Sequence, residues 1–263
     1  MPPALPLITL LTDFGIKDYF VASMKGVILT INPDARLIDI SHGISSHQIA
    51  EAAYCLHACY RTFPEGAVHV VVVDPGVGGA RRPILVTTSR YVFVAPDNGV
   101  LTPVFAEEQD VEIRHLENRR YQLDSPGGTF HGRDLFAPAA AWLTKGETPS
   151  SFGRLISDPI RLNWPQPAVA ERRIIGEVVY IDCFGNLISN IAVGQCHMMK
   201  PGCARIQVGA HAIGNIVASY SDGAADVPHA LINSNGMLEI FLKERSARDC
   251  MQAGVGTIVE VTW

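Results

Sequence analysis

The sequence predicts an α/β protein of two domains, an amino-terminal domain with a mainly parallel sheet flanked by helices and a small carboxyl-terminal antiparallel β-barrel. In the first part of the chain, apolar strand-like runs alternate with helical patterns, which is typical of a parallel sheet covered by helices. In the last part, short strands are separated by turns, which is typical of a small barrel. A proline-rich stretch divides the two parts. We therefore expect domains at residues 1–160 and 172–263, joined by a linker at 161–171.

The strands of the first domain are expected where apolar runs end in turn residues. The run Val70 to Val73 consists of valines only, which suits a strand buried on both faces of a sheet. The complete set of runs is 6–12, 68–73, 84–88 and 91–95.

Three helices are expected in the same domain. The first covers residues 18–31, the second begins after a cap at Ser45 or Ser46, and the third covers residues 134–143. The second shows a clear buried stripe formed by Ile49, Ala53, Leu56 and Tyr60.

The linker and the second domain follow from a change of pattern. Ser157-Asp158-Pro159 and Trp164-Pro165-Gln166-Pro167 cannot continue a helix or a central strand. Beyond them, strands are expected at 174–181, 205–208, 238–242 and 257–261.

Charge and hydropathy exclude several partners. The formal net charge of −5 provides no basic surface for nucleic acid. No apolar run approaches the roughly 18 residues of a membrane span, and no basic flank or cleavage site marks a leader. We therefore expect a cytoplasmic protein that binds neither nucleic acid nor membrane.

The six cysteines form no Cys-x-x-Cys pair and no secretory framework. Cys55, His57 and Cys59 share one helix, but packing explains them better than metal binding. We expect reduced cysteines and no metal site.

The segment from Asp74 to Arg81 follows the four valines and combines a carboxylate, glycines and an arginine. Open α/β sheets bind ligands at the carboxyl ends of their strands. Taken alone, Asp74 is typical of a turn or a helix cap, and Arg81 of a surface residue. The glycines do not complete G-x-G-x-x-G, which disfavours a dinucleotide enzyme.

A second glycine-rich segment, residues 127–134, places His131 before a helix. Glycines beside the histidine allow close approach of a small ligand, although a lone histidine is more often structural. Pro-Asp-Asn-Gly (96–99) and Asp-Cys-Phe-Gly-Asn (182–186) are equally good turn sequences by themselves.

Together, five segments carry a resemblance. They are Leu-Thr-Asp-Phe-Gly (11–15), Val-Asp-Pro-Gly-Val-Gly followed by Arg81, Pro-Asp-Asn-Gly (96–99), Phe-His-Gly-Arg-Asp (130–134) and Asp-Cys-Phe-Gly-Asn (182–186). In this order they resemble the S-adenosyl-L-methionine (SAM) hydroxide adenosyltransferases, relatives of the fluorinating and chlorinating enzymes that attack the same substrate. The similarity runs from Leu11 to Glu239. It implies an α/β domain, a β-barrel, and a homotrimer with active sites at subunit interfaces.

The resemblance implies hydrolysis of SAM to adenosine and L-methionine by water that attacks the ribose 5′ carbon. It makes Asp74, Arg81 and His131 the water-binding, catalytic residues. A sulfonium is an excellent leaving group, so a positioned oxygen nucleophile suffices and no cofactor or metal is required. Which of Asp74 and His131 takes the proton is open, because interacting groups titrate as a set.

The resemblance also implies substrate-binding residues. Asp13 binds the ribose hydroxyls, although such a residue also suits the cap of the following helix. In the second domain, Asp182 and Ser234 hold the methionine amine and carboxylate, and Phe184 and Asn186 face the adenine. Ser234 also lies in a strong turn sequence, and adenine contacts after Leu242 cannot be assigned.

Two alternatives stay open, a SAM-dependent halogenase and a non-catalytic module that binds SAM or adenosine. Asp74 favours water, because a carboxylate in a low-dielectric site repels a halide. His47 stands where halogenating relatives have an aromatic wall, and a histidine at a helix start is its simpler interpretation. A methyltransferase ranks last, since Leu-Thr-Asp-Phe-Gly replaces the glycine signature expected after the first strand.

Overall fold

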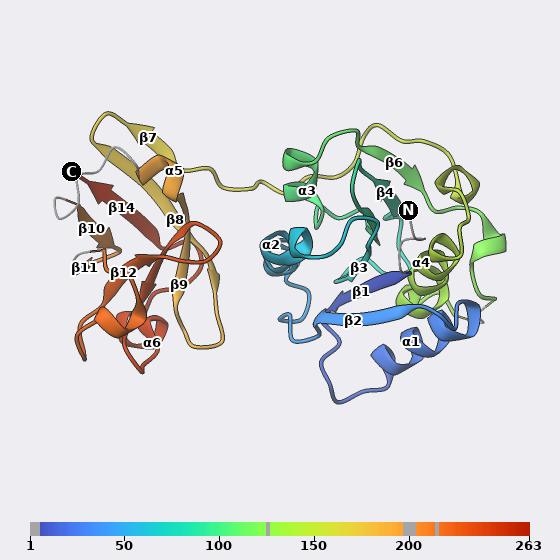
Figure 1. Cartoon of the computed structure of the whole chain (residues 1–263), viewed down its shortest axis with the longest axis horizontal. Coiled ribbons are helices and arrows are strands. Elements are labelled where there is room, and N and C mark those ends of the chain that lie inside the picture. Colours follow the sequence, from blue (N-terminus) through green and yellow to red (C-terminus); the bar gives the residue numbers. More distant parts are fainter. Residues whose placement is uncertain (1–5, 125–126, 197–203, 214–215) are drawn as a thin grey trace. The chain divides into compact units, whose positions relative to one another are not determined.

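The computed structural model describes residues 6–124, 127–196, 204–213 and 216–263. The chain divides into two compact units, Met1–Trp164 and Pro165–Trp263 (Figure 1). Among the described residues, no helix combines the length and apolar character that crossing a membrane requires.

The first unit is built on a six-stranded sheet of order β2-β1-β3-β5-β4-β6. The pairings β1/β2, β1/β3 and β3/β5 are parallel, whereas β4 runs antiparallel to β5 and β6. This confirms the predicted mainly parallel sheet. The strands are β1 Leu7–Thr12, β2 Arg36–Ser41, β3 Val68–Val72, β4 Pro83–Thr87, β5 Val92–Pro96 and β6 Glu112–His115.

Helices cover both faces of this sheet, because its central strands are apolar on both sides. On β1, Ile8 and Leu10 belong to one buried cluster and Leu7 and Leu11 to the other, as strand alternation requires. The helices of this unit are α1 Phe20–Ile31, α2 Ile49–Cys59, α3 Thr102–Glu107 and α4 Ala137–Thr144, with short turns η1 Tyr60–Thr62, η2 Arg119–Tyr121, η3 Gly132–Phe136 and η4 Pro149–Phe152.

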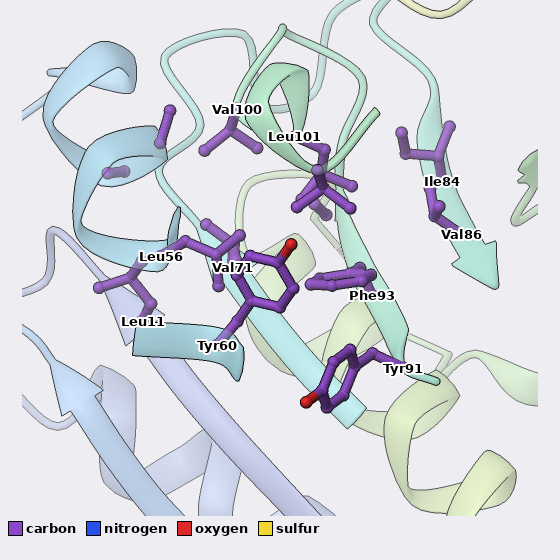
Figure 2. Close-up of a cluster of buried hydrophobic side chains, with 14 of the residues drawn as sticks. Leu11, Leu56, Tyr60, Val71, Ile84, Val86, Tyr91, Phe93, Val100 and Leu101 are labelled. Carbon is purple, nitrogen blue, oxygen red and sulfur yellow. The ribbon is translucent and has the colours of Figure 1, made fainter. Parts of the chain in front are cut away.

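The core on the α2 side combines leucines, valines and aromatic rings (Figure 2). Tyr60 and Phe93 are fully buried there, with ring centroids 5.5 Å apart. Burying a side chain of this size contributes about 1.5–3 kcal/mol to folding. The stripe expected on the second helix is thus confirmed as a core contact.

His69 is a fully buried histidine in this same core. Its Nδ1 atom lies 2.7 Å from Thr9 Oγ1, and its ring stacks on Phe93. Burial lowers the pKa of His69 to about 4, so the imidazole is neutral at ordinary pH.

Several elements differ from the sequence predictions. Strands β2 and β6 were not expected, because their polar, partly exposed sequences at the sheet edges lack an apolar run. The cap prediction for α2 was wrong. Gln48 occupies that position, because the chain first turns at His47, whose φ is +68°. The third helix begins earlier than expected, with a π-helical turn at Gly132–Phe136.

The second unit is an eight-stranded antiparallel sheet of order β11-β10-β14-β8-β9-β13-β12, with β7 paired to β8. Strand β8 pairs with β14 along its first part and with β9 along its last part, and its register shifts between Val178 and Tyr180. A long strand shared in this way curls the sheet toward a barrel, which confirms the predicted barrel-like fold.

The elements of the second unit are short. They are β7 Ala168–Ala170, β8 Arg173–Ile181, β9 Leu187–Ala192, α5 Val193–Cys196, β10 Arg205–Val208, β11 His211–Ile213, η5 Tyr220–Asp222, β12 His229–Ile232, β13 Met237–Phe241, α6 Ala247–Met251 and β14 Ile258–Thr262.

Candidate active site

Two loops of the first unit meet because their strands are parallel neighbours. Thr12 at the end of β1 pairs with Val72 at the end of β3. The loops that begin at Asp13 and Asp74 therefore leave the same edge of the sheet. A cavity of about 750 Å³ opens there, and Asp13, Asp74 and His131 all line it.

Asp74 and Arg81 form a bidentate ion pair at this cavity. Arg81 Nε donates to Asp74 Oδ1 at 2.8 Å, and Arg81 Nη2 donates to Asp74 Oδ2. The Arg81 side chain is only 8% exposed and that of Asp74 only 5%, so water screens the pair little. Gly78, at φ +76°, allows the loop between the two residues to turn back.

Arg81 also binds His131, and this contact fixes the state of the imidazole. Arg81 Nη2 lies 2.7 Å from His131 Nδ1. A guanidinium can only donate, so Nδ1 must accept and a neutral ring carries its proton on Nε2. Burial, and then the charge of Arg81, lower the pKa of His131, which favours this neutral form.

The three predicted catalytic residues are thus brought together, but they are not equivalent. Asp74 and His131 line the cavity, whereas Arg81 is not among its lining residues. Arg81 Nη1 is buried and has no hydrogen-bond partner within the described part of the chain. In this arrangement Arg81 holds the two groups that face the cavity.

A close approach explains the glycine after His131. A Cβ atom on Gly132 would lie 3.1 Å from the Met24 sulfur and 3.3 Å from the Phe130 ring. A larger residue would displace the turn that carries the imidazole.

Asp13 lines the same cavity, and its carboxylate is held by the chain before α2. Asp13 Oδ2 accepts the His47 backbone N–H at 2.9 Å. Asp13 does not cap α1, because that helix starts at Phe20 with Tyr19 as its N-cap residue. His47 itself is exposed and lines the cavity.

Aromatic side chains form another part of the cavity lining, which the sequence interpretation did not identify. Phe14, Phe20 and Phe130 lie with ring centroids 5.3–5.9 Å apart. The positions of Phe14 and Phe130 next to Asp13 and His131 in the sequence were the available signal.

The second unit has a cavity of its own, also of about 750 Å³, lined by Asp182, Phe184 and Asn186 from the β8–β9 turn. Asp182 Oδ1 accepts the backbone N–H groups of Phe184 and Asn186, and Oδ2 accepts the Asn186 side-chain amide, each at 2.9 Å. Asp182 therefore shapes its own turn. Phe184 leaves 74% of its surface exposed at this cavity, which is unusual for a large apolar side chain.

The sequence analysis did not identify Tyr220, which lines this cavity, or the hydrogen bonds that connect it to Glu239 and Asn233. Tyr220 lines the cavity, and its hydroxyl donates to Glu239 Oε1 at 2.6 Å. Burial, followed by this hydrogen bond, raises the pKa of Tyr220. The Asn233 side-chain amide donates to the other Glu239 oxygen at 3.1 Å. An acidic residue inside the apolar run 238–242 was the signal that could have revealed this network.

Ser234 lies on the exposed turn between β12 and β13 and is not among the residues that line the cavity of the second unit. Its role in substrate binding stays a prediction.

The cysteines of α2 are poor candidates for metal binding. Burial, with a smaller contribution from neighbouring groups, raises the pKa of Cys55 to about 11 and that of Cys59 to about 12. Both thiols are therefore protonated at neutral pH in the absence of a metal, and within the described part of the chain no three His, Cys, Asp or Glu side chains are grouped so that they could hold one.

Comparison with known families decides the assignment. The family model for the SAM hydroxide adenosyltransferase N-terminal domain matches residues 8–153, and that for the C-terminal domain matches residues 176–260. The chain belongs to this family. Asp74, Arg81 and His131 lie in the first match, and the turn from Asp182 to Asn186 lies in the second.

Similar sequences and a similar solved structure support the assignment of the chain to the SAM hydroxide adenosyltransferase family. An (R)-S-adenosyl-L-methionine hydrolase from Thermus thermophilus is 33% identical over 248 residues, 92% of this chain and 93% of its own. A fluorinase from an Actinoplanes species is 29% identical over 213 residues, 71% of this chain and 72% of its own. A solved structure of an uncharacterized conserved protein from Thermotoga maritima superposes with a TM-score of 0.91 at 34% identity, covering 97% of this chain and 100% of that one.

Proposed function

We propose that this protein hydrolyses SAM to adenosine and L-methionine by attack of water on the ribose 5′ carbon. The observation that carries this proposal is the Asp74 carboxylate, held by Arg81 at a cavity that also contains neutral His131. The hydrolase relative, similar over nearly the whole chain, supports the same reaction.

The proposed step is a single in-line displacement. The water oxygen forms a bond to the 5′ carbon while the carbon–sulfur bond breaks, and the electron pair of that bond neutralises the sulfonium. The attacking oxygen becomes acidic as its new bond forms, so a carboxylate can accept its proton late in the step. The proton then passes to solvent, which leaves adenosine and methionine.

Asp74 is the better candidate for the proton acceptor. The Nδ1 atom of His131 already accepts from Arg81, and the remaining nitrogen of the neutral ring carries a hydrogen. His131 can therefore donate a hydrogen bond to the water oxygen, which orients a lone pair toward the 5′ carbon. Arg81 positions both groups, and its charge stabilises developing hydroxide character.

The charge of Asp74 also favours hydrolysis over halogenation. A halide beside the Asp74 carboxylate is repelled by the part of its charge that Arg81 does not offset, and a halide has no hydrogen to donate to the carboxylate. Water has no such penalty and can donate to the carboxylate. The site therefore favours water as the nucleophile.

Substrate binding is proposed to use both units. The carboxylate of Asp13 would accept hydrogen bonds from the two ribose hydroxyls. Phe184 presents an exposed ring suited to stacking on adenine beside Asn186. Asp182 and Ser234 would hold the amine and the carboxylate of the methionine part. SAM is the substrate, and the chemistry needs no cofactor.

We further propose a homotrimer with active sites at subunit interfaces. Ile16 and Tyr19, beside Asp13 in the sequence, are 96% and 67% exposed, which suits coverage by a neighbouring copy. We propose a cytoplasmic location because Cys55, Cys59, Cys183 and Cys250 are free thiols, as in a reducing compartment.

Product analysis tests the proposed reaction. Purified protein is incubated with SAM in buffers without halide and with added chloride or fluoride, and the nucleosides are separated by chromatography. Adenosine and methionine in equal amounts, independent of halide, are the expected result. A 5′-halo nucleoside would establish halogenation instead, and tight SAM binding without product would indicate a binding module.

A further inference from the structure

A series of polar contacts links the surface of the first unit to the loop that carries Asp13. Lys25 Nζ donates to Asp39 Oδ2 at 2.6 Å, and Asp39 Oδ1 lies 3.1 Å from His42 Nε2. His42 Nδ1 lies 2.9 Å from Thr12 Oγ1, and Thr12 Oγ1 accepts the Phe14 backbone N–H at 3.2 Å. The last of these contacts joins Thr12 and Phe14, the two sequence neighbours of Asp13.

The donor and the acceptor in the contacts of His42 can be assigned from its neighbours. The nitrogen of His42 that faces the Asp39 carboxylate is Nε2, which favours the tautomer with its proton there, so Nδ1 accepts from the Thr12 hydroxyl. A ring that accepts at Nδ1 carries its hydrogen on Nε2, which faces the carboxylate of Asp39. The proton on Nε2 is then close to the Asp39 carboxylate, as an electrostatic contact rather than a hydrogen bond, and Lys25 balances the carboxylate charge.

His42 holds the Asp13 loop at a second point through its backbone. The Gly15 N–H donates to the His42 carbonyl at 2.7 Å, and Gly15 needs its positive φ of +66° to reach it. The His42 side chain is only 8% exposed and Thr12 is fully buried, so water competes little with these contacts.

The fold explains why these residues meet. Thr12 ends β1 and His42 follows β2 directly, and the two strands are parallel neighbours. The register shifts between Leu10 and Leu11, so that one residue of β2 is skipped at the carboxyl end. An irregularity of this kind re-aims the residues that follow it.

We propose that His42 is a positioning residue that holds the carboxylate of Asp13 in place to bind the ribose of SAM. This inference rests on the proposed function for the identity of the ligand. His42 does not line the cavity, so it acts through Thr12 and the backbone of the loop rather than on the substrate.

Two substitutions distinguish the contributions of the two ring nitrogens of His42. Asparagine places its carbonyl oxygen near the position of Nδ1 and can still accept from Thr12, whereas glutamine reaches toward Asp39 and leaves Thr12 unpaired. We expect His42→Asn to keep KM for SAM within about 3-fold of the wild type and His42→Gln to raise it about 10-fold, the equivalent of one hydrogen bond. His57→Gln is the matched control, because His57 pairs with Glu107 near the surface and does not line the cavity.

A double-mutant cycle tests whether His42 acts through Asp13. The factor by which His42→Gln lowers kcat/KM should shrink to less than about 2-fold when Asp13 is already alanine. The same factor in both backgrounds would overturn the proposal. Thr12→Val, with Thr12→Ser as its control, removes the same hydrogen bond from the other side if the histidine variants fold poorly.

Hydrogen exchange makes the test independent of turnover. In substrate-free protein, the backbone amides of Phe14 and Gly15 should exchange at least about 10-fold faster in His42→Gln than in His42→Asn. Equal protection in the two variants would refute positioning by His42. Wild-type protein that neither binds nor hydrolyses SAM would contradict the proposed function alone, because the exchange result still decides how the loop is held.

Discussion

Arg81 and His131 share a hydrogen bond whose direction is fixed, because the guanidinium donates and the Nδ1 atom 2.7 Å away must accept. The same guanidinium binds both oxygens of Asp74. One cation therefore sets the tautomer of the imidazole and the orientation of the carboxylate. This division of labour leads to different expectations for the residues at the cavity.

Asp74→Asn should lower kcat by at least about 100-fold and change KM by less than about 3-fold, because the amide keeps the shape but cannot accept the proton. Asp13→Ala should mainly raise KM. Steady-state kinetics with SAM measure both. Asp158→Asn is the matched control, since Asp158 pairs with Arg82 and has a side chain that is 76% exposed. Unchanged turnover in Asp74→Asn would remove Asp74 from the mechanism.

Activity should be lost on the acid side with an apparent pKa below the 6.5 of an ordinary histidine, because the pKa of His131 is lowered by burial and by Arg81. As the pH falls through that value, Nδ1 gains a proton and can no longer accept from Arg81. The pH dependence of kcat/KM measures this limb. His131→Asn, which retains an acceptor but cannot titrate, should lack it. An unaltered limb in this variant would assign the titration to another group.

Buried His69 should make folding stability depend on pH. The unfolded chain binds a proton at this residue near pH 6.5, whereas the pKa of His69 in the folded protein is about 4. The contribution of neutral His69 to the free energy of unfolding is complete above pH 6.5. It falls by roughly 3 kcal/mol as the pH drops from 6.5 to 4. Urea unfolding at several pH values measures this for the wild type and for Thr9→Val/His69→Phe, in which both bonded partners are apolar. Parallel pH profiles for the two proteins would contradict the expectation.

Glu239→Gln should weaken adenosine binding about 10-fold. In the wild type the two carboxylate oxygens of Glu239 accept from Tyr220 and Asn233, whereas a carboxamide has only one acceptor oxygen for these two donors. Calorimetric titration with adenosine measures the loss. Glu260→Gln, a change at a surface pair with Arg173, is the control. If both variants bind adenosine alike, Glu239 does not shape a nucleoside site.

The fold class could be predicted because burial on both faces of a strand leaves continuous apolar runs, as at Val70 to Val73. Strand β2 could not, since an edge strand with Arg36, Asp39 and Ser41 has no apolar pattern and is defined only by its pairing with β1. The cap of α2 was misjudged for a tertiary reason, because His47 donates its backbone N–H to Asp13 and delays the helix.

The grouping of the candidate catalytic residues could also be predicted in part. Asp74, Arg81 and His131 follow from ordered motifs, and the structure brings all three together. The structure shows that Asp74 and His131 line the cavity whereas Arg81 does not, and this difference depends on side-chain packing that the spacing of motifs in the sequence does not reveal. The contacts of His42 and Glu239 arise only when strands β1 and β2, or the η5 turn and β13, become neighbours.

The fate of an oxygen label shows whether water attacks the 5′ carbon of SAM. Hydrolysis is carried out in H₂¹⁸O, and the adenosine is analysed by mass spectrometry with fragmentation of the ribose. We expect one ¹⁸O atom per adenosine, located at the 5′ hydroxyl, and none in methionine. Adenosine without the label, or a label at any other position, would contradict direct attack by water.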